Sequence, residues 1–119
     1  MNNEVSWILT THLATAEPKV FEGLMVEMVK AVQQMQGDTT AYVWYLSEDG
    51  QSCEIFTSFK DSNSAMLHLT WFSNTYSKQF MDTLHPTGMT VYGKPTQELR
   101  NALASLSPRY VQTVGGFAR

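Results

Sequence analysis

The segment from Tyr42 to Leu46 limits the folds open to this chain more than any other feature. It reads Tyr-Val-Trp-Tyr-Leu, so apolar side chains occupy both of the alternating positions of a strand. A strand in a sheet with one wet face alternates apolar and polar residues more cleanly. We therefore expect a sheet that is covered on both faces.

The low share of charged residues supports the same expectation. Only 16% of the chain is Asp, Glu, Lys or Arg, whereas about 25% is usual for a globular domain. Because a monomer must cover its surface with polar groups, this shortage predicts that some surface is hidden in a partner. The simplest partner is a second copy related by a two-fold axis, so we predict a homodimer.

The balance of charge argues against two other kinds of partner. The chain has 8 basic and 11 acidic residues, a net charge of -3, and its Lys and Arg residues are scattered singly. Nucleic acids and anionic membranes both attract clustered positive charge. We therefore expect no nucleic-acid partner and no membrane partner.

The periodicity of the remaining segments predicts an α+β fold. Strands are expected over 4–13, 39–47, 52–60, 88–93 and 109–114, and helices over 18–36, 61–84 and from 96 to Pro108. The length of 119 residues fits a single domain, 1–119. The first six elements have the order βαββαβ of the ferredoxin-like arrangement, in which both helices cover one face of the sheet. A further helix and strand follow at the C-terminus.

Local signals support several of these boundaries. Pro18 suits a first helical turn, and Asp49-Gly50 favours a hairpin. Asp61 is a good N-cap for the second helix. Ser73-Asn74-Thr75 should weaken the middle of that helix, because these side chains compete for backbone hydrogen bonds. His85-Pro86 is expected to end it.

His68 is the candidate catalytic residue. It lies beside the apolar stripe of the second helix, three residues after Ala65 and four before Phe72. An imidazole with a pKa near 6.5 suits proton transfer from a phenol or enol at neutral pH. The alternative is a partly buried histidine that only satisfies a structural hydrogen bond.

Aromatic side chains are frequent for so short a chain, at 12% of residues. Flat aromatic walls suit a flat apolar ligand, although aromatic residues are also enriched in cores and interfaces. The candidate substrate-binding residues are Trp44, Trp71, Phe72, Tyr92 and Tyr42.

No metal or cofactor is expected. The three histidines and the lone Cys53 show no metal-ligand spacing, and no glycine-rich phosphate loop is present. Cys53 is predicted to be an inert buried thiol. A single cysteine and the absence of an apolar leader segment fit a cytoplasmic protein.

Two stretches resemble the antibiotic-biosynthesis-monooxygenase-like (ABM-like) proteins of the dimeric α+β barrel superfamily. The first is Cys53 to Asp61 running into Ser64 to Leu69, and the second is Val91 to Leu99, with the late Gly116-Phe117. The resemblance implies a homodimer with sheets packed face to face and an apolar pocket in each subunit. Some members oxidise quinol-like aromatics with oxygen and no metal or flavin. Haem-degrading members carry Trp and His where this chain has His68 and Lys78, so haem degradation is disfavoured.

Three functions follow from these observations. The first is a small-molecule enzyme resembling a cofactor-independent monooxygenase that acts on an aromatic or quinol-like compound, with His68 as the acid/base group. The second is a non-catalytic module that binds a small apolar or aromatic ligand. The third is a purely structural homodimer whose aromatic residues all belong to the interface.

Overall fold

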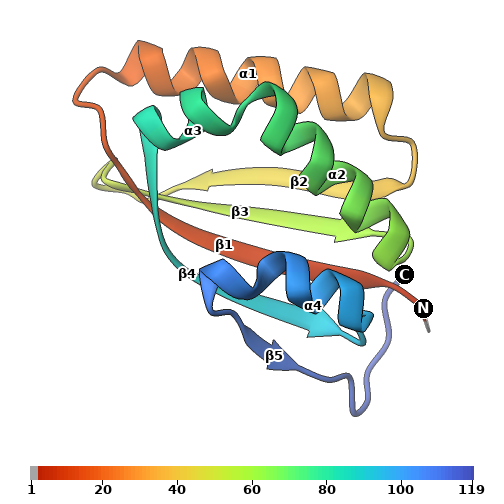
Figure 1. The fold of residues 1–119 in the computed structure, drawn as a ribbon. Helices are drawn as coiled ribbons and strands as arrows, with labels where there is room; N and C mark the ends of the chain where they lie inside the picture. Colours follow the sequence, from red (N-terminus) through yellow and green to blue (C-terminus); the bar gives the residue numbers. More distant parts are fainter. Residues whose placement is uncertain (1–2) are drawn as a thin grey trace.

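The computed structural model describes residues 3–119. One five-stranded sheet has the strand order β2-β3-β1-β4-β5, and all neighbouring strands are antiparallel except β4 and β5. The helices gather on one face of this sheet (Figure 1). The elements are β1 (Val5–Leu13), α1 (Pro18–Met35), β2 (Thr39–Leu46), β3 (Ser52–Phe59), α2 (Ser62–Thr75), α3 (Ser77–Thr83), β4 (Leu84–Gly93), α4 (Gln97–Leu103), the 3-10 turn η1 (Ala104–Leu106) and β5 (Arg109–Val111). The predicted ferredoxin-like α+β fold is confirmed.

The core fills the space between the sheet and the helices. The strand residues that point toward the helices are buried, as shown by Val5 and Phe59, which are fully enclosed. The ring centroids of Trp7 and Phe59 lie 4.7 Å apart and tie β1 to β3. Leu24 and Met28 of α1 are each 1% exposed. Burying one such side chain contributes roughly 1.5 to 3 kcal/mol, so this layer provides most of the stability.

The opposite side of the sheet, here called the open face, is not covered by any element of the described chain. One row of register partners crosses it from β2 to β4 through Val43, Phe56, Ile8 and Thr90. Val43 is 39% exposed and Tyr45, further along β2, is 58% exposed. The strand from Tyr42 to Leu46 is thus apolar on both sides, as predicted, but this chain covers only one of them.

The second predicted helix, 61–84, is in fact two helices. Asp61 caps α2 as predicted, since its carboxylate accepts a hydrogen bond from the Ser64 amide at 2.8 Å. The helix then breaks at Tyr76, whose backbone angles are φ -120° and ψ -4°. The break follows directly after Ser73-Asn74-Thr75, the segment expected to be weak. α3 therefore begins at Ser77 and packs separately.

β4 begins at Leu84, four residues earlier than predicted. His85-Pro86 does end the helix, but both residues continue in the strand. Thr10 pairs with Gly88 and Thr11 pairs with Pro86, so Thr87 is an extra, bulged residue. A bulge is one of the few places where a sheet tolerates proline. The predicted helix end was therefore right, and the predicted start of the strand at residue 88 was wrong.

The last strand is shorter than the predicted 109–114. β5 covers Arg109 to Val111 and pairs in parallel with Thr90 to Tyr92 of β4. It therefore extends the sheet of its own chain at one edge (Figure 1). In the described residues, no helix is both long and apolar enough to cross a lipid bilayer.

Candidate functional site

His68 lies on the side of α2 that faces the sheet, and it is only 6% exposed. Four aromatic rings surround its imidazole, with centroid distances from 5.2 to 6.3 Å. They belong, in order of increasing distance, to Phe59, Trp71, Tyr42 and Trp7. The predicted catalytic residue thus sits in an aromatic enclosure built from β1, β2, β3 and its own helix.

One hydrogen bond is made inside this enclosure. His68 Nδ1 lies 2.8 Å from Oε1 of Gln36. Burial lowers the pKa of His68 to about 4, because the apolar surroundings disfavour the charged imidazolium. The imidazole is therefore neutral at pH 7. A neutral ring accepts a hydrogen bond through one nitrogen and donates through the other.

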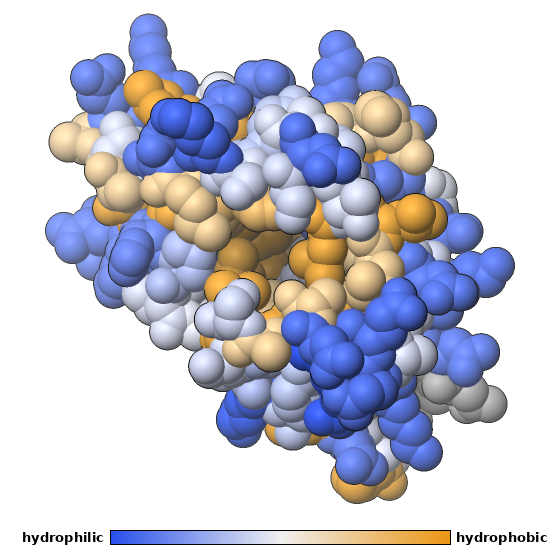
Figure 2. Space-filling view, viewed as in Figure 1, coloured by the Kyte–Doolittle hydropathy of each residue, from blue (hydrophilic) through white to orange (hydrophobic). Residues whose placement is uncertain are grey.

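His68 forms part of the wall of a small cavity in the core that opens to the surface, here called the core cavity. Its volume is about 80 Å³. The surface above it is hollowed near the centre of the molecule, and the residues in the depth of the hollow are hydrophobic (Figure 2). The lining residues include Trp7, Leu9, Met28, Tyr42, Ile55, Thr57, His68, Leu69, Phe72, Phe80, Met81, Pro86, Met89 and Leu106.

The size of the core cavity limits what can bind without rearrangement. An apolar cavity of about 150 Å³ accepts benzene, and the core cavity, at about 80 Å³, is smaller than that. Three of the lining side chains are Met28, Met81 and Met89. Methionine is unbranched and adapts its shape readily. We therefore expect a bound ring to shift these side chains.

Thr57 adds a second polar group that the sequence-based candidates did not include. It is 1% exposed, lines the core cavity, and its hydroxyl has no hydrogen-bond partner among the described residues. A buried hydroxyl without a partner costs about 1 to 3 kcal/mol. Its signal was available, because Thr57 is the polar residue at the centre of an inward strand face that also carries Ile55 and Phe59.

Four of the five predicted substrate-binding residues lie on the helix side of the sheet or in α2, and they divide into three groups. Tyr42 and Phe72 line the core cavity directly. Trp71 lies one layer out, with its ring 5.4 Å from that of His68. Trp44 packs with its ring 5.9 Å from that of Phe21 and 6.2 Å from that of Tyr42.

Tyr92 does not lie with the others. It pairs with Ser6 on β1, whereas Val91, its neighbour, pairs with Trp7. Because successive strand residues point to opposite faces, Tyr92 projects from the open face, where it is 38% exposed. The prediction that it shapes the same pocket as His68 is therefore corrected.

Tyr42 and Cys53 keep their protons at neutral pH. Burial raises the pKa of the Tyr42 phenol well above its usual value and raises the pKa of the Cys53 thiol to about 11. Tyr42 is therefore a neutral group, and Cys53 is a poor nucleophile. Among the described residues, no group of three His, Cys, Asp or Glu side chains could hold a metal ion.

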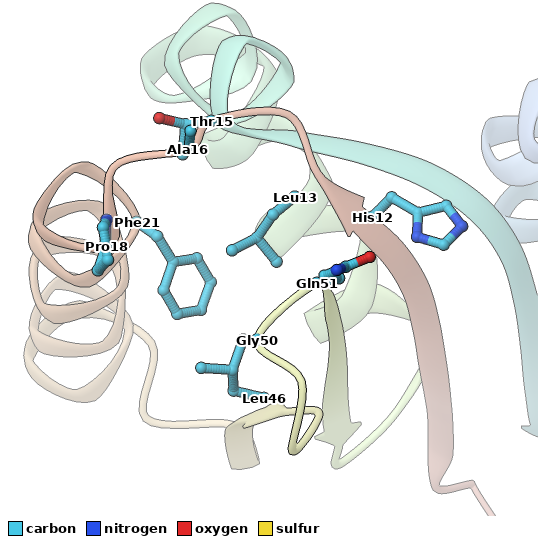
Figure 3. Close-up of a pocket in the computed structure, with 9 residues that line it drawn as sticks. All are labelled: His12, Leu13, Thr15, Ala16, Pro18, Phe21, Leu46, Gly50 and Gln51. Carbon is cyan, nitrogen blue, oxygen red and sulfur yellow. The ribbon is translucent and has the colours of Figure 1, made fainter.

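A larger depression of about 530 Å³ lies at the end of the sheet between the start of α1 and the β2–β3 hairpin. Leu13 and Phe21 point into it, while the ring of His12 lies on the other side of β1 (Figure 3). His12 is exposed. The depression therefore lacks the buried polar groups that the core cavity brings together, and the core cavity is the better candidate site.

Comparison with known proteins identifies the fold. The sequence matches no protein-family model and no curated protein. MupZ from Pseudomonas fluorescens aligns with a TM-score of 0.79 at 14% identity, over 99% of this chain and 96% of that one. The chain therefore shares the fold of MupZ.

Two further solved structures share the fold over less of the chain. SnoaB, a cofactor-independent oxygenase from Streptomyces nogalater, has a TM-score of 0.66 at 10% identity, over 80% of this chain and 96% of that one. A dimeric protein of unknown function from Bacteroides fragilis, with a ferredoxin-like fold, has a TM-score of 0.58 at 13% identity, over 76% and 96%. At these identities the similarity defines the fold.

Proposed function

We propose that the core cavity binds a small aromatic, quinol-like compound and that the chain acts on it as a cofactor-independent monooxygenase-like enzyme. The observation that carries this proposal is a neutral imidazole and an unpartnered hydroxyl in one apolar cavity, contributed by His68 and Thr57. Apolar walls with a few convergent polar groups are typical of small-molecule sites. The cofactor-independent oxygenase SnoaB, which shares the fold, supports the reaction class.

The proposed chemistry begins with a proton transfer. A phenolic hydroxyl of the substrate donates its hydrogen bond to the free imidazole nitrogen of His68. Transfer of that proton leaves a phenolate, whose negative charge beside the imidazolium raises the pKa of His68 from its low resting value. The Thr57 hydroxyl donates a hydrogen bond to the phenolate oxygen. Both buried groups therefore favour the electron-rich form of the substrate.

The electrons for the oxidation come from the substrate itself. A phenolic ring C–H becomes a quinone carbonyl, with one oxygen atom of O₂ entering the product. The other oxygen atom leaves as water with two hydrogens from the substrate. The reaction therefore balances as phenol plus O₂ giving quinone plus water. It calls for no other reductant, and the protein contributes orientation, a base and exclusion of bulk water.

Oxygen consumption with a panel of small quinols and phenols tests the proposal. The wild-type protein should consume oxygen above the buffer rate with at least one of them, and His68→Gln should lose most of that activity. Tyr92→Phe is the matched control, because Tyr92 lies on the open face. If every compound gives the buffer rate, or if His68→Gln retains full activity, the enzymatic proposal is wrong.

A non-catalytic binding module is the second candidate. The low pKa of His68 favours it, because a base works best when its pKa lies near the working pH. This function predicts saturable quenching of tryptophan fluorescence by a phenol without formation of product. Trp7 lines the core cavity and Trp71 lies beside His68. A ligand bound in the core cavity should therefore quench the fluorescence of both tryptophans.

We further propose that a second copy of the chain covers the open face. The exposed apolar side chains of Val43 and Tyr45 and the low charge content support this arrangement. The dimeric protein from Bacteroides fragilis provides a precedent in the same fold. If no ligand binds, the dimer alone remains as a structural function for the chain.

A further inference from the structure

Gln36 connects His68 to the end of α1. The residue is the C-cap of that helix, and its backbone is held on both sides: its amide donates to Val32 O at 2.9 Å, and its carbonyl accepts from the Thr39 amide at 3.1 Å. Its side-chain oxygen Oε1 receives two contacts, at 2.8 Å from His68 Nδ1 and at 3.2 Å from Thr39 Oγ1. The amide is therefore fixed between β2 and α2.

We infer that Gln36 is a positioning residue that holds the proton of His68 on Nδ1, so that Nε2 is the hydrogen-bond acceptor offered to a ligand in the core cavity. An amide oxygen can only accept, so the ring nitrogen that contacts it must donate. Because a neutral imidazole carries one N–H, its other nitrogen then has a free lone pair. This inference rests on the proposed function of the core cavity and names the group that the site recognises.

The orientation of the Gln36 side-chain amide determines which nitrogen of His68 carries the proton. Oε1 faces His68 and Thr39, and Nε2 of Gln36 is buried without a partner in the described structure. An amide turned the other way would place an N–H against Nδ1 and force the proton of His68 onto Nε2. The ring would then donate into the core cavity. The two orientations therefore predict opposite ligand chemistry and can be distinguished by experiment.

An accepting Nε2 defines a class of ligand. It selects a compound that offers a hydroxyl donor, such as a phenol or an enol, and gives no hydrogen bond to a quinone, which has only acceptor oxygens. The site would thus hold the reduced substrate better than the oxidised product. A neutral partner such as Gln36 also gives no full negative charge to stabilise an imidazolium, in contrast to a carboxylate at the same position.

The surroundings of the ring contain little else that titrates. Of the four aromatic rings around His68, contributed by β1, β2, β3 and α2, only that of Tyr42 is titratable. Burial keeps Tyr42 protonated at neutral pH. A change at residue 36 should therefore be the strongest available influence on the protonation of His68.

Nitrogen-15 NMR of histidine-labelled full-length protein tests the inference without any ligand. In the wild type at pH 7, His68 should show a protonated Nδ1 and an unprotonated Nε2. Gln36→Met, which removes the acceptor at similar length, should shift the ring toward the Nε2–H form. Gln36→Glu should keep Nδ1 protonated and raise the midpoint of the His68 titration by one pH unit or more. Gln34→Glu, two residues earlier on the exposed surface of α1, should change neither reading.

A wild-type ring protonated on Nε2, or a Gln36→Met ring with an unchanged tautomer, would overturn the inference. The wild-type spectrum decides even if a variant fails to fold. Turnover is a separate measurement. In Gln36→Glu, the acidic limb of the pH–rate profile should move to higher pH. If no compound is oxidised but the tautomer is as expected, the proposed reaction fails while the role of Gln36 stands.

Discussion

Thr57 on β3 lies directly opposite Trp7 on β1, so a hydroxyl without a hydrogen-bond partner stands beside an indole in the wall of the core cavity. The same threonine pairs with Tyr42 on its other side. A polar atom in this position lowers the stability of the empty protein, and a ligand that bonds to it recovers the loss. The Thr57 hydroxyl thus lowers the stability of the empty protein and favours the binding of a ligand.

Thr57→Val should separate these two effects. Valine has nearly the same shape but no hydroxyl, so the free energy of unfolding should rise by about 1 kcal/mol. Thermal melts at pH 7 measure this change, and fluorescence titration should show weaker phenol binding. Thr11→Val is the matched control, because the Thr11 hydroxyl is satisfied by Cys53 O at 2.8 Å. Thr11→Val should destabilise the protein. If Thr57→Val also loses stability, the Thr57 hydroxyl does not lower the stability of the empty protein.

The stability of the protein should fall in mild acid because of His68. The unfolded chain titrates near the ordinary value of 6.5, while burial lowers the folded pKa to about 4. Between these values the unfolded state binds more protons, so the free energy of unfolding should decrease as the pH falls from 6.5 to 4, by roughly 3 kcal/mol in total. Above pH 6.5 this contribution should be constant.

Melts from pH 7 to pH 4 check this dependence. His68→Gln removes the buried titration and should flatten the curve over that window, whereas His12→Gln, on an exposed residue, should leave the slope intact. A wild-type stability that is constant between pH 6.5 and pH 4 would show that the imidazole is better solvated than its position implies.

The open face should control association. Wild-type protein at micromolar concentration should sediment at twice 13.4 kDa, and Val43→Glu should shift it toward the monomer by placing a charge in the apolar row. Val26→Glu introduces the same charge on α1, where the valine is 57% exposed, and should leave the dimer unchanged. A wild-type monomer would rule out the proposed role of this face.

Gly93 should be intolerant of any side chain. Its φ is +106°, and a Cβ there would lie 2.6 Å from the carbonyl oxygen of Glu4. Gly93→Ala should therefore destabilise the protein by about 2 kcal/mol or more. Gly88→Ala, in the same strand but with nothing within 4 Å of the added carbon, should cost much less. Equal melting temperatures for the two variants would contradict this explanation.

The sequence predicted the first half of the chain closely. The helix expected over 18–36 is α1 over Pro18–Met35, and the strand expected over 52–60 is β3 over Ser52–Phe59. These elements have strong periodicity and clear end signals, such as Asp49-Gly50, whose glycine has φ +73°. Local rules decide their limits, so a single sequence was enough.

The predictions from the sequence were wrong or missing where contacts between distant parts of the chain determine the structure. Pro86 is compatible with β4 because it lies beside a bulge and outside the stretch from Thr90 to Tyr92 that pairs with β5, so its missing N–H is tolerated. Gln36 had no signal at all, since its partner His68 is 32 residues away. Tyr92 was misplaced because the sequence of β4 does not show which of its two faces the helices cover, and Val91 rather than Tyr92 lies on that side.

The junction between α3 and β4 links the core cavity to the start of β4. Thr83 ends the helix and Leu84 begins the strand, so no connecting residue separates them. Phe80 lines the core cavity and packs in the same cluster as Leu84. A ligand that displaces Phe80 should therefore also disturb the packing of Leu84, where β4 begins. Binding at the core cavity should then change the hydrogen-exchange protection of the first residues of β4.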